Sequence, residues 1–272
     1  MQDASPQNLP DTDTQPTAPR SLGLLALLAS LVAIAVGIGV WLGVFAVIIF
    51  AIATLFDGMG IVYGLIEDFE RFDPRRLGSD FGAQRAVFAG GVVIYLAALA
   101  SLVCVARLFG GRSMACMLGW TGSWPAMTRT GWLLMACALA YHVVAGSALR
   151  YFFPEFALWI IPPGDAISLI LSFVMIVILA PLVEELFFRG WLFGSLRARF
   201  SAVVTILATA VLFAIVHMDP TGLYPIAVLA PGLVLSVIRE RTGSVKPAVM
   251  AHALYNGVGW LLLLFVTALF VR

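Results

Sequence analysis

The chain has 272 residues, of which 61% are hydrophobic and only 11% carry a charged side chain. Soluble domains are about 45–50% apolar and about 25% charged, so this composition excludes an ordinary soluble protein. The formal net charge of +1 and the lack of a basic stripe give no reason to expect a nucleic-acid partner. The apolar residues fall in long runs, and about 20 in a row cross the hydrocarbon core of a bilayer as a helix. The lipid bilayer is therefore the expected partner.

The first 85 residues contain a polar tail, a long apolar run and a polar segment. Residues 1–20 include four prolines and three aspartates, so we expect them to be a disordered tail. Residues 21–56 would form a helix of about 54 Å, which is longer than a bilayer core is thick. We expect one helix because no polar turn interrupts the run; a hairpin that breaks at one of its glycines is the alternative. Residues 57–85 are expected to form a polar loop at the membrane interface.

Six further apolar runs predict membrane-spanning helices over residues 86–108, 132–149, 172–196, 202–217, 223–238 and 247–271. With the first run, they predict an all-α, polytopic transmembrane bundle of seven spans, or eight if the first run is a hairpin. The Lys and Arg distribution weakly favours a cytoplasmic N-terminus and a cytoplasmic position for Arg197, Arg199, Arg239 and Arg241. If the chain is bacterial, the membrane would be the plasma (inner) membrane. We divide the chain into the tail (1–20), N-terminal transmembrane helices (21–160) and a C-terminal transmembrane core (161–272).

Glu184 and Glu185 can be placed in two ways. A span over 167–183 would leave them at a helix end, whereas a span over 172–196 would bury them in the bilayer. An unpaired acid there costs about 2.5–3.5 kcal/mol. We favour the buried position, because a helix end in the headgroup zone is rarely followed by so many large apolar residues: Leu186, Phe187, Phe188, Trp191, Leu192 and Phe193.

Few residues within the apolar runs can ionise, and most of them cluster in the last third of the chain. Glu185 and Arg189 are four residues apart on one helix, so they share a face and can neutralise each other. His252 and Asn256 have the same spacing in the last run, and His217 lies near the end of the fifth. Because lipid offers such groups no partners, we expect them to face one another around a shared wet cavity.

Three motifs resemble those of the type II CAAX prenyl endopeptidases, also called the CPBP or Abi family. Glu184-Glu185-Leu-Phe-Phe-Arg189 resembles the family's EExxxR signature, Phe213-Ala-Ile-Val-His217 resembles FxxxH, and His252-Ala-Leu-Tyr-Asn256 resembles HxxxN. The motifs occur in the family's order, and the resemblance covers about residues 168–271.

The resemblance implies an intramembrane endopeptidase acting on a peptide or protein substrate that is lipidated or membrane-bound. Glu184 would activate water together with His217, while His252 and Asn256 would stabilise the oxyanion. Arg189 paired with Glu185 would support the helix. Metal use is left open by the resemblance: zinc commonly takes His and Glu ligands, so a divalent ion at Glu184, His217 and His252 is an alternative to a metal-free site.

The competing hypothesis is a non-enzymatic membrane protein with the same fold. A proton-coupled transporter uses the same residue types in the same setting, and an immunity or scaffold protein would have lost activity. The transporter is disfavoured because no internal repeat is visible in the sequence. Lost activity is disfavoured because every position of the three motifs is occupied by the expected residue.

Overall fold

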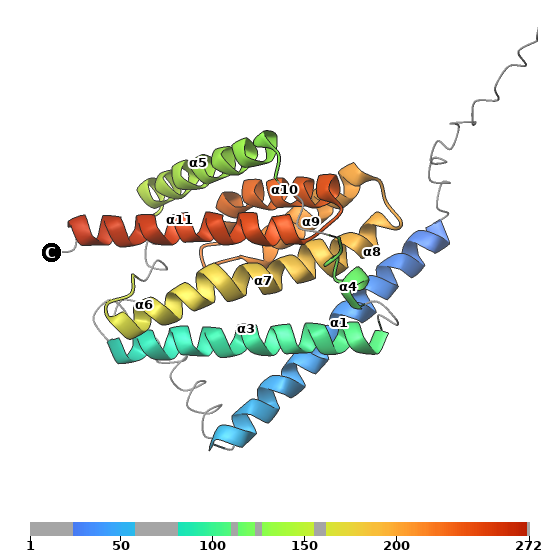
Figure 1. The fold of residues 1–272 in the computed structure, drawn as a ribbon, viewed down its shortest axis with the longest axis horizontal. Coiled ribbons are helices and arrows are strands. Elements are labelled where there is room, and N and C mark those ends of the chain that lie inside the picture. Colours follow the sequence, from blue (N-terminus) through green and yellow to red (C-terminus); the bar gives the residue numbers. More distant parts are fainter. Residues whose placement is uncertain (1–23, 58–80, 110–113, 123–126, 155–161, 271–272) are drawn as a thin grey trace, which may run out of the picture.

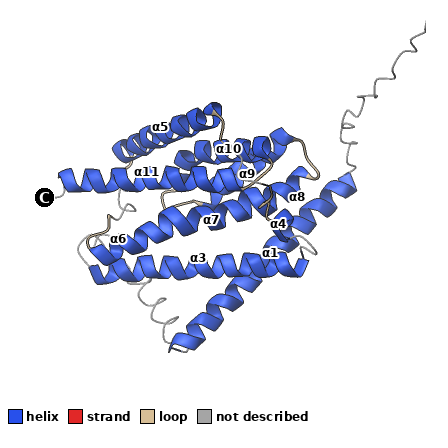
Figure 2. Ribbon diagram, in the orientation of Figure 1, coloured by secondary structure: helices blue, strands red, loops and turns tan. Residues whose placement is uncertain are grey.

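The computed structural model describes residues 24–57, 81–109, 114–122, 127–154 and 162–270, and in these ranges it contains helices and no strand (Figures 1 and 2). The prediction of an all-α bundle is confirmed. The helices are α1 (Leu24–Asp57), α3 (Phe81–Phe109), α4 (Met114–Met117), α5 (Arg129–Phe152), α6 (Ala166–Phe173), η3 (Val174–Leu179), α7 (Ala180–Glu185), η4 (Leu186–Leu192), α8 (Phe193–Arg197), α9 (Ala202–Val216), α10 (Tyr224–Thr242) and α11 (Lys246–Phe270).

The apolar runs predicted from the sequence are helical, with differences at their ends. The described part of the run predicted over residues 21–56 lies in one helix, α1 (Leu24–Asp57), as expected. Helix α3 starts at Phe81, five residues before the predicted span. Helix α10 continues to Thr242, so Arg239 and Arg241 lie in its last turn and not in a loop. The predicted disordered tail and most of the predicted polar loop lie outside the described residues.

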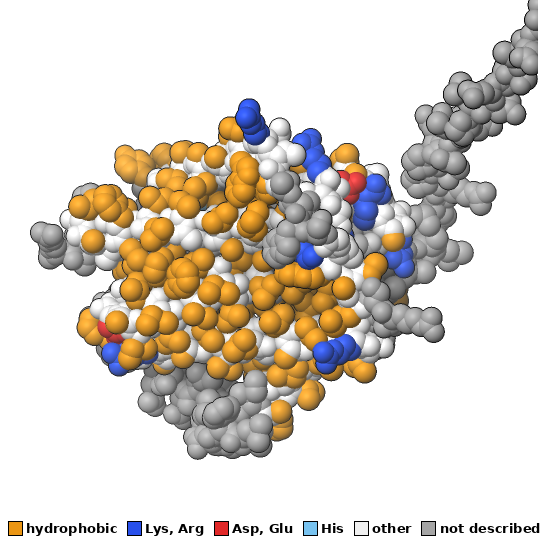
Figure 3. Space-filling view, in the orientation of Figure 1, with side chains coloured by type: hydrophobic (Ala, Val, Ile, Leu, Met, Phe, Trp, Pro, Cys, Tyr) orange, Lys and Arg blue, Asp and Glu red, His pale blue; other side chains and the backbone are white. Residues whose placement is uncertain are grey.

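Four helical segments in the described part of the chain are long and apolar enough to cross a bilayer: Phe81–Leu108, Arg129–Phe152, Ala166–Arg197 and Lys246–Leu269. Large apolar side chains cover the face seen in Figure 3, and Lys and Arg side chains gather mainly near one end of the bundle. This distribution is that of an integral membrane protein, since lipid covers apolar faces and water covers charged ends. The span count of seven remains a prediction.

The rod of helix from Ala166 to Arg197 lies between α3 and α11 (Figure 1). It contains two π-helical stretches, η3 and η4, which flank α7 and its glutamates. Pro181 accounts for the first stretch: it has no backbone N–H and its ring collides with the carbonyl four residues earlier. The turn widens, and the N–H of Ala180 bonds to Met175 five residues back. Such widenings often occur at functional sites.

The start of this rod is joined to the start of α3 by polar contacts. The Asp165 carboxylate caps α6 by accepting the Ser168 N–H at 2.8 Å, and it pairs with Arg85 of α3 at 2.9 Å. The Ser168 N–H and the Arg85 guanidinium hold the pKa of Asp165 below its ordinary value. These contacts fix the two helices at one end of the bundle.

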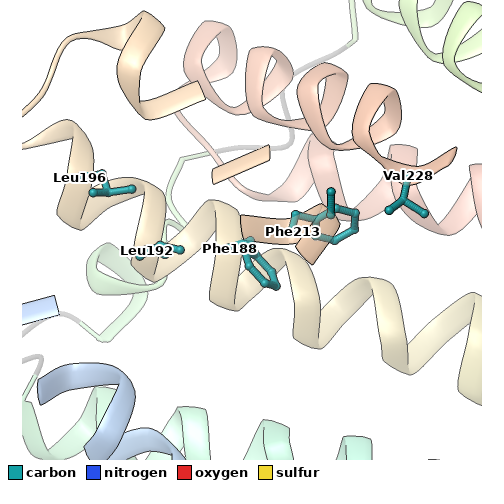
Figure 4. Packing of buried hydrophobic residues seen from close by; sticks show 6 residues of the cluster. Phe188, Leu192, Leu196, Phe213 and Val228 are labelled. Atoms are coloured by element: carbon teal, nitrogen blue, oxygen red, sulfur yellow. The ribbon is translucent and has the colours of Figure 1, made fainter. Parts of the chain in front are cut away.

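Helices α9 and α10 form an antiparallel pair that packs against the rod on one side and α5 on the other. A cluster of buried apolar residues fills the space between the rod and this pair (Figure 4): Phe188, Leu192, Leu196, Phe213, Ala214 and Val228. Burial of a large apolar side chain stabilises by roughly 1.5–3 kcal/mol in water; in lipid the gain comes from close packing.

Candidate active site

The four predicted catalytic residues line one cavity of about 190 Å³. Glu184 comes from α7, His217 follows the last turn of α9, and His252 and Asn256 come from α11. The cavity also contacts α3 and α10 through Tyr95 and Tyr224. Thus five separate helices meet at the point where the polar side chains gather.

Glu184 lies at the centre of the polar group. Its Oε2 is 3.6 Å from Nε2 of His217 and 4.0 Å from Nε2 of His252. Its Oε1 accepts a hydrogen bond from the Tyr95 hydroxyl at 2.8 Å. Oε2 is buried and accepts no hydrogen bond from the described part of the chain. One carboxylate oxygen is therefore held and the other faces the two imidazoles.

Glu185 is not among the residues that line the cavity, and it is fully buried. Its Oε1 accepts from Arg189 at 2.8 Å, as the spacing predicts, and also lies 2.9 Å from Nδ1 of His252. Arg189 is equally buried, donates to the Gly232 carbonyl at 2.8 Å, and lies over the Phe213 ring at 4.3 Å. The pair thus joins the rod to α10 and α11 and does more than stiffen one helix.

The hydrogen bonds of the two histidines fix which ring nitrogens face Glu184. His217 Nδ1 is 2.7 Å from the Phe213 carbonyl, and a carbonyl can only accept. His252 Nδ1 faces Glu185, which is an acceptor while it is paired with Arg189. Both Nδ1 atoms therefore carry a proton, and both Nε2 atoms present a lone pair unless the ring is doubly protonated. Glu184 Oε2 and the two Nε2 atoms are then three acceptors near one another, to which a water molecule could donate its two protons.

The phenylalanine of the FxxxH motif, Phe213, has a structural role in the site. Phe213 supplies the carbonyl that orients His217, and its ring lies 4.4 Å from the His217 ring. The same ring contacts Phe188 and His252 edge-on, at 5.3 and 5.8 Å between centroids. Phe213 therefore belongs both to the apolar cluster in Figure 4 and to the cavity lining, and its ring packs against His217, His252 and Arg189.

Asn256 is anchored by the irregular backbone of the rod. Its Nδ2 donates to the Ile176 carbonyl at 2.8 Å. That carbonyl cannot receive an N–H from Pro181, five residues on, and the N–H of Ala180 is bonded to Met175. The Asn256 side chain thus replaces the missing backbone donor. Such a replacement is needed because the interior of a bilayer offers no water to satisfy the carbonyl. One amide hydrogen of Asn256 remains for another partner.

Sequence reasoning did not identify Tyr95 or Tyr224 as residues of the cavity. Both are aromatic residues in apolar runs, where tyrosine is a common packing residue, and both lie outside the three motifs. His142 of α5 does not line the cavity, and its Nδ1 lies 3.2 Å from the Ala227 carbonyl. Pro231 explains this contact, because it leaves that carbonyl without its helical N–H donor.

The predicted alternative of a metal at Glu184, His217 and His252 finds no support in their arrangement. In the described residues, no group of three or more His, Cys, Asp or Glu side chains is arranged to hold a metal ion. Glu185, which orients His252 through Nδ1, has the role of an outer partner with or without a metal. Zinc at this site remains a prediction that metal analysis of the purified protein would test.

Comparison with known proteins supports the resemblance drawn from the motifs. Residues 166–258 match the family model described as "Type II CAAX prenyl endopeptidase Rce1-like". An Escherichia coli protein, described as "Uncharacterized 24.3 kDa protein", is 33% identical over 126 residues, which are 44% of this chain and 58% of that protein. The chain therefore spans little more than half the length of this relative. No solved structure matches.

The matched segment contains all three motifs, and it begins with α6 and ends in α11. It includes every one of the predicted site residues: Glu184, Glu185, Arg189, His217, His252 and Asn256. Residues 166–258, which surround the cavity of this integral membrane protein, are thus similar to the type II CAAX prenyl endopeptidase Rce1-like family.

Proposed function

We propose that this protein is an intramembrane endopeptidase that hydrolyses a peptide bond with a water molecule activated by Glu184 and His217. The observation that carries the proposal is the approach of Glu184 Oε2 to the two imidazole Nε2 atoms, at 3.6 and 4.0 Å, inside one cavity. A water at this point can donate one proton to Glu184 and one to His217. Its lone pair is then directed at a carbonyl carbon of a peptide lying in the cavity.

The attack leaves a negative charge on the former carbonyl oxygen, and His252 and Asn256 are placed to stabilise it. Asn256 has one amide hydrogen left after its bond to the Ile176 carbonyl. His252 can donate from Nε2 only when the ring is an imidazolium, since its Nδ1 proton is directed at Glu185. Glu185 and Arg189 form a neutral pair, so a charged His252 would be balanced by Glu184 in the resting site.

The collapse of the tetrahedral intermediate needs a proton for the leaving amine. The proton that Glu184 or His217 took from water is returned to the amine nitrogen, so that one water is consumed and two peptide ends are formed. No covalent enzyme intermediate is needed.

The substrate is proposed to be a peptide presented at the membrane, lipidated or itself membrane-bound. The description of the matching family includes the words "CAAX prenyl endopeptidase", and a lipidated or membrane-bound peptide would approach the cavity from the bilayer. The location is proposed to be the plasma (inner) membrane if the chain is bacterial. Neither a nucleic acid nor a soluble partner is needed for this reaction.

The direct test is cleavage of membrane-anchored peptides by the purified protein in nanodiscs. Glu184→Ala, His217→Ala and His252→Ala should each abolish cleavage while the folded protein accumulates normally. His142→Ala is the matched control: it is the one other histidine of the sequence, and it does not line the cavity. Cleavage by Glu184→Ala at the wild-type rate would refute the proposal. Proton-coupled uptake into proteoliposomes that Glu184→Gln abolishes would instead favour a transporter.

A further inference from the structure

One contact to the central carboxylate comes from outside the family segment. The Tyr95 hydroxyl of α3 donates to Glu184 Oε1 at 2.8 Å across 89 positions of sequence. The matched residues begin at 166, so Tyr95 belongs to a helix that the family model does not include. The three motifs therefore do not predict this contact.

The backbone of α3 is placed for this contact by a glycine one turn before the tyrosine. A Cβ built on Gly91 would lie 2.1 Å from the sulfur of Met175 in η3, so only glycine allows this approach without displacement. Gly91 and Tyr95 are four residues apart and share one face of α3. Met175 and Tyr95 both line the cavity. The close approach of α3 to the rod thus brings the hydroxyl within reach of Glu184.

The hydrogen bond from Tyr95 determines how the Glu184 carboxylate is rotated. Rotation about the last bond of a glutamate side chain is broad and nearly two-fold, so the two oxygens exchange easily unless one is held. Tyr95 holds Oε1, and Oε2 is left to face His217 and His252 without a hydrogen bond from the described part of the chain. The donor also leaves Oε2 as the oxygen available to water.

We infer that Tyr95 is a positioning residue for the reaction and that α3 is part of the active unit. The inference rests on the proposed function, in which Glu184 accepts a proton from water through Oε2. A protein reduced to the family segment would keep the three motifs and lose the donor that orients Glu184. Tyr95 would act through Glu184, to which its hydroxyl donates.

The test compares two variants, each of which removes one tyrosine hydroxyl: Tyr95→Phe in α3 and Tyr141→Phe in α5. Tyr141 also donates at 2.8 Å, to the Ile226 carbonyl, but does not line the cavity. We expect Tyr95→Phe to lower kcat about ten- to hundredfold with KM nearly unchanged, because a hydrogen bond to a charged group is lost without removing substrate contacts. Tyr141→Phe should leave both constants within about twofold. Equal effects of the two variants would overturn the inference.

A second measurement is independent of catalysis. The infrared band of the Glu184 side chain, identified by its loss in Glu184→Gln, should shift in Tyr95→Phe and stay in place in Tyr141→Phe. If Tyr95→Phe does not accumulate, Tyr95→3-fluorotyrosine serves instead: fluorine makes the hydroxyl a stronger donor, and the band should shift in the opposite direction. An unshifted band would refute the contact. A shifted band together with full cleavage by Glu184→Ala would refute the proposed function alone.

Discussion

The buried pair of Glu185 and Arg189 gives a prediction whose size follows from the structure. In Glu185→Gln the shape of the side chain is kept and its charge is lost. Both partners are fully buried, so the guanidinium would remain charged without its counter-ion. Breaking a buried pair in this way costs about 3–5 kcal/mol. The second oxygen of Glu185 accepts no hydrogen bond from the described residues, so a carboxamide N–H at that position would add an unsatisfied donor.

Two contacts of Arg189 remain in Glu185→Gln and limit the loss of stability. The guanidinium keeps the Gly232 carbonyl at 2.8 Å and the face of the Phe213 ring at 4.3 Å. The carboxamide oxygen can still accept the proton on His252 Nδ1. Glu185→Gln should therefore lower the free energy of unfolding by about 3–5 kcal/mol and reduce expression, while the surviving folded protein retains part of its activity.

The assay is SDS titration in mixed micelles, followed by far-UV circular dichroism. Glu240→Gln is the matched control, because its pair with Arg197 is partly exposed and should contribute less than about 1 kcal/mol. The double variant Glu185→Gln/Arg189→Met removes both buried charges and should be more stable than Glu185→Gln. A Glu185→Gln protein as stable as the wild type but inactive would refute the reasoning and assign the catalytic role to Glu185 in place of Glu184.

Two further predictions concern stability alone. Gly190→Ala would place a Cβ 2.3 Å from the Leu118 carbonyl oxygen and should cost about 1–3 kcal/mol in SDS titration, whereas Gly194→Ala, with nothing within 4 Å, should be neutral or slightly stabilising. For Asp165→Asn, the lowered pKa of the carboxyl means that its charge stabilises the fold above about pH 4 and that this contribution is lost as the pH falls through the folded pKa. The variant should thus be less stable than the wild type at pH 7, and the difference should shrink as the pH falls below about 4; a constant difference would contradict this.

The sequence predicted the helices and the grouping of the polar residues for one reason. Hydrocarbon satisfies neither a backbone amide nor a charged side chain, so apolar runs must be helical and acids and bases must face each other. The i, i+4 spacing of Glu185 and Arg189 identified their ion pair directly. The same spacing placed His252 and Asn256 on one face of α11, and both line the cavity.

The sequence could not predict contacts that depend on how helices pack. Glu185 was assigned to Arg189 alone, yet its Oε1 also lies 2.9 Å from His252, 67 positions away. Tyr95 was missed because its role depends on the approach of α3 to η3 at Gly91. The spacing within one helix determines a face, but it does not determine which neighbouring helix that face meets.

Pro181 and Pro231 connect the local helix structure to the packing of neighbouring helices. Pro181 leaves the Ile176 carbonyl without a helical donor, and Asn256 of α11 supplies one. Pro231 does the same to the Ala227 carbonyl, which is approached by His142 of α5. In water either carbonyl could be satisfied by solvent; in a bilayer each must be met by a side chain from another helix. Pro181 therefore has two effects: it widens the rod beside Glu184, and it leaves a carbonyl that α11, the helix of His252, must satisfy. The irregular backbone and the assembly of the site thus have the same cause.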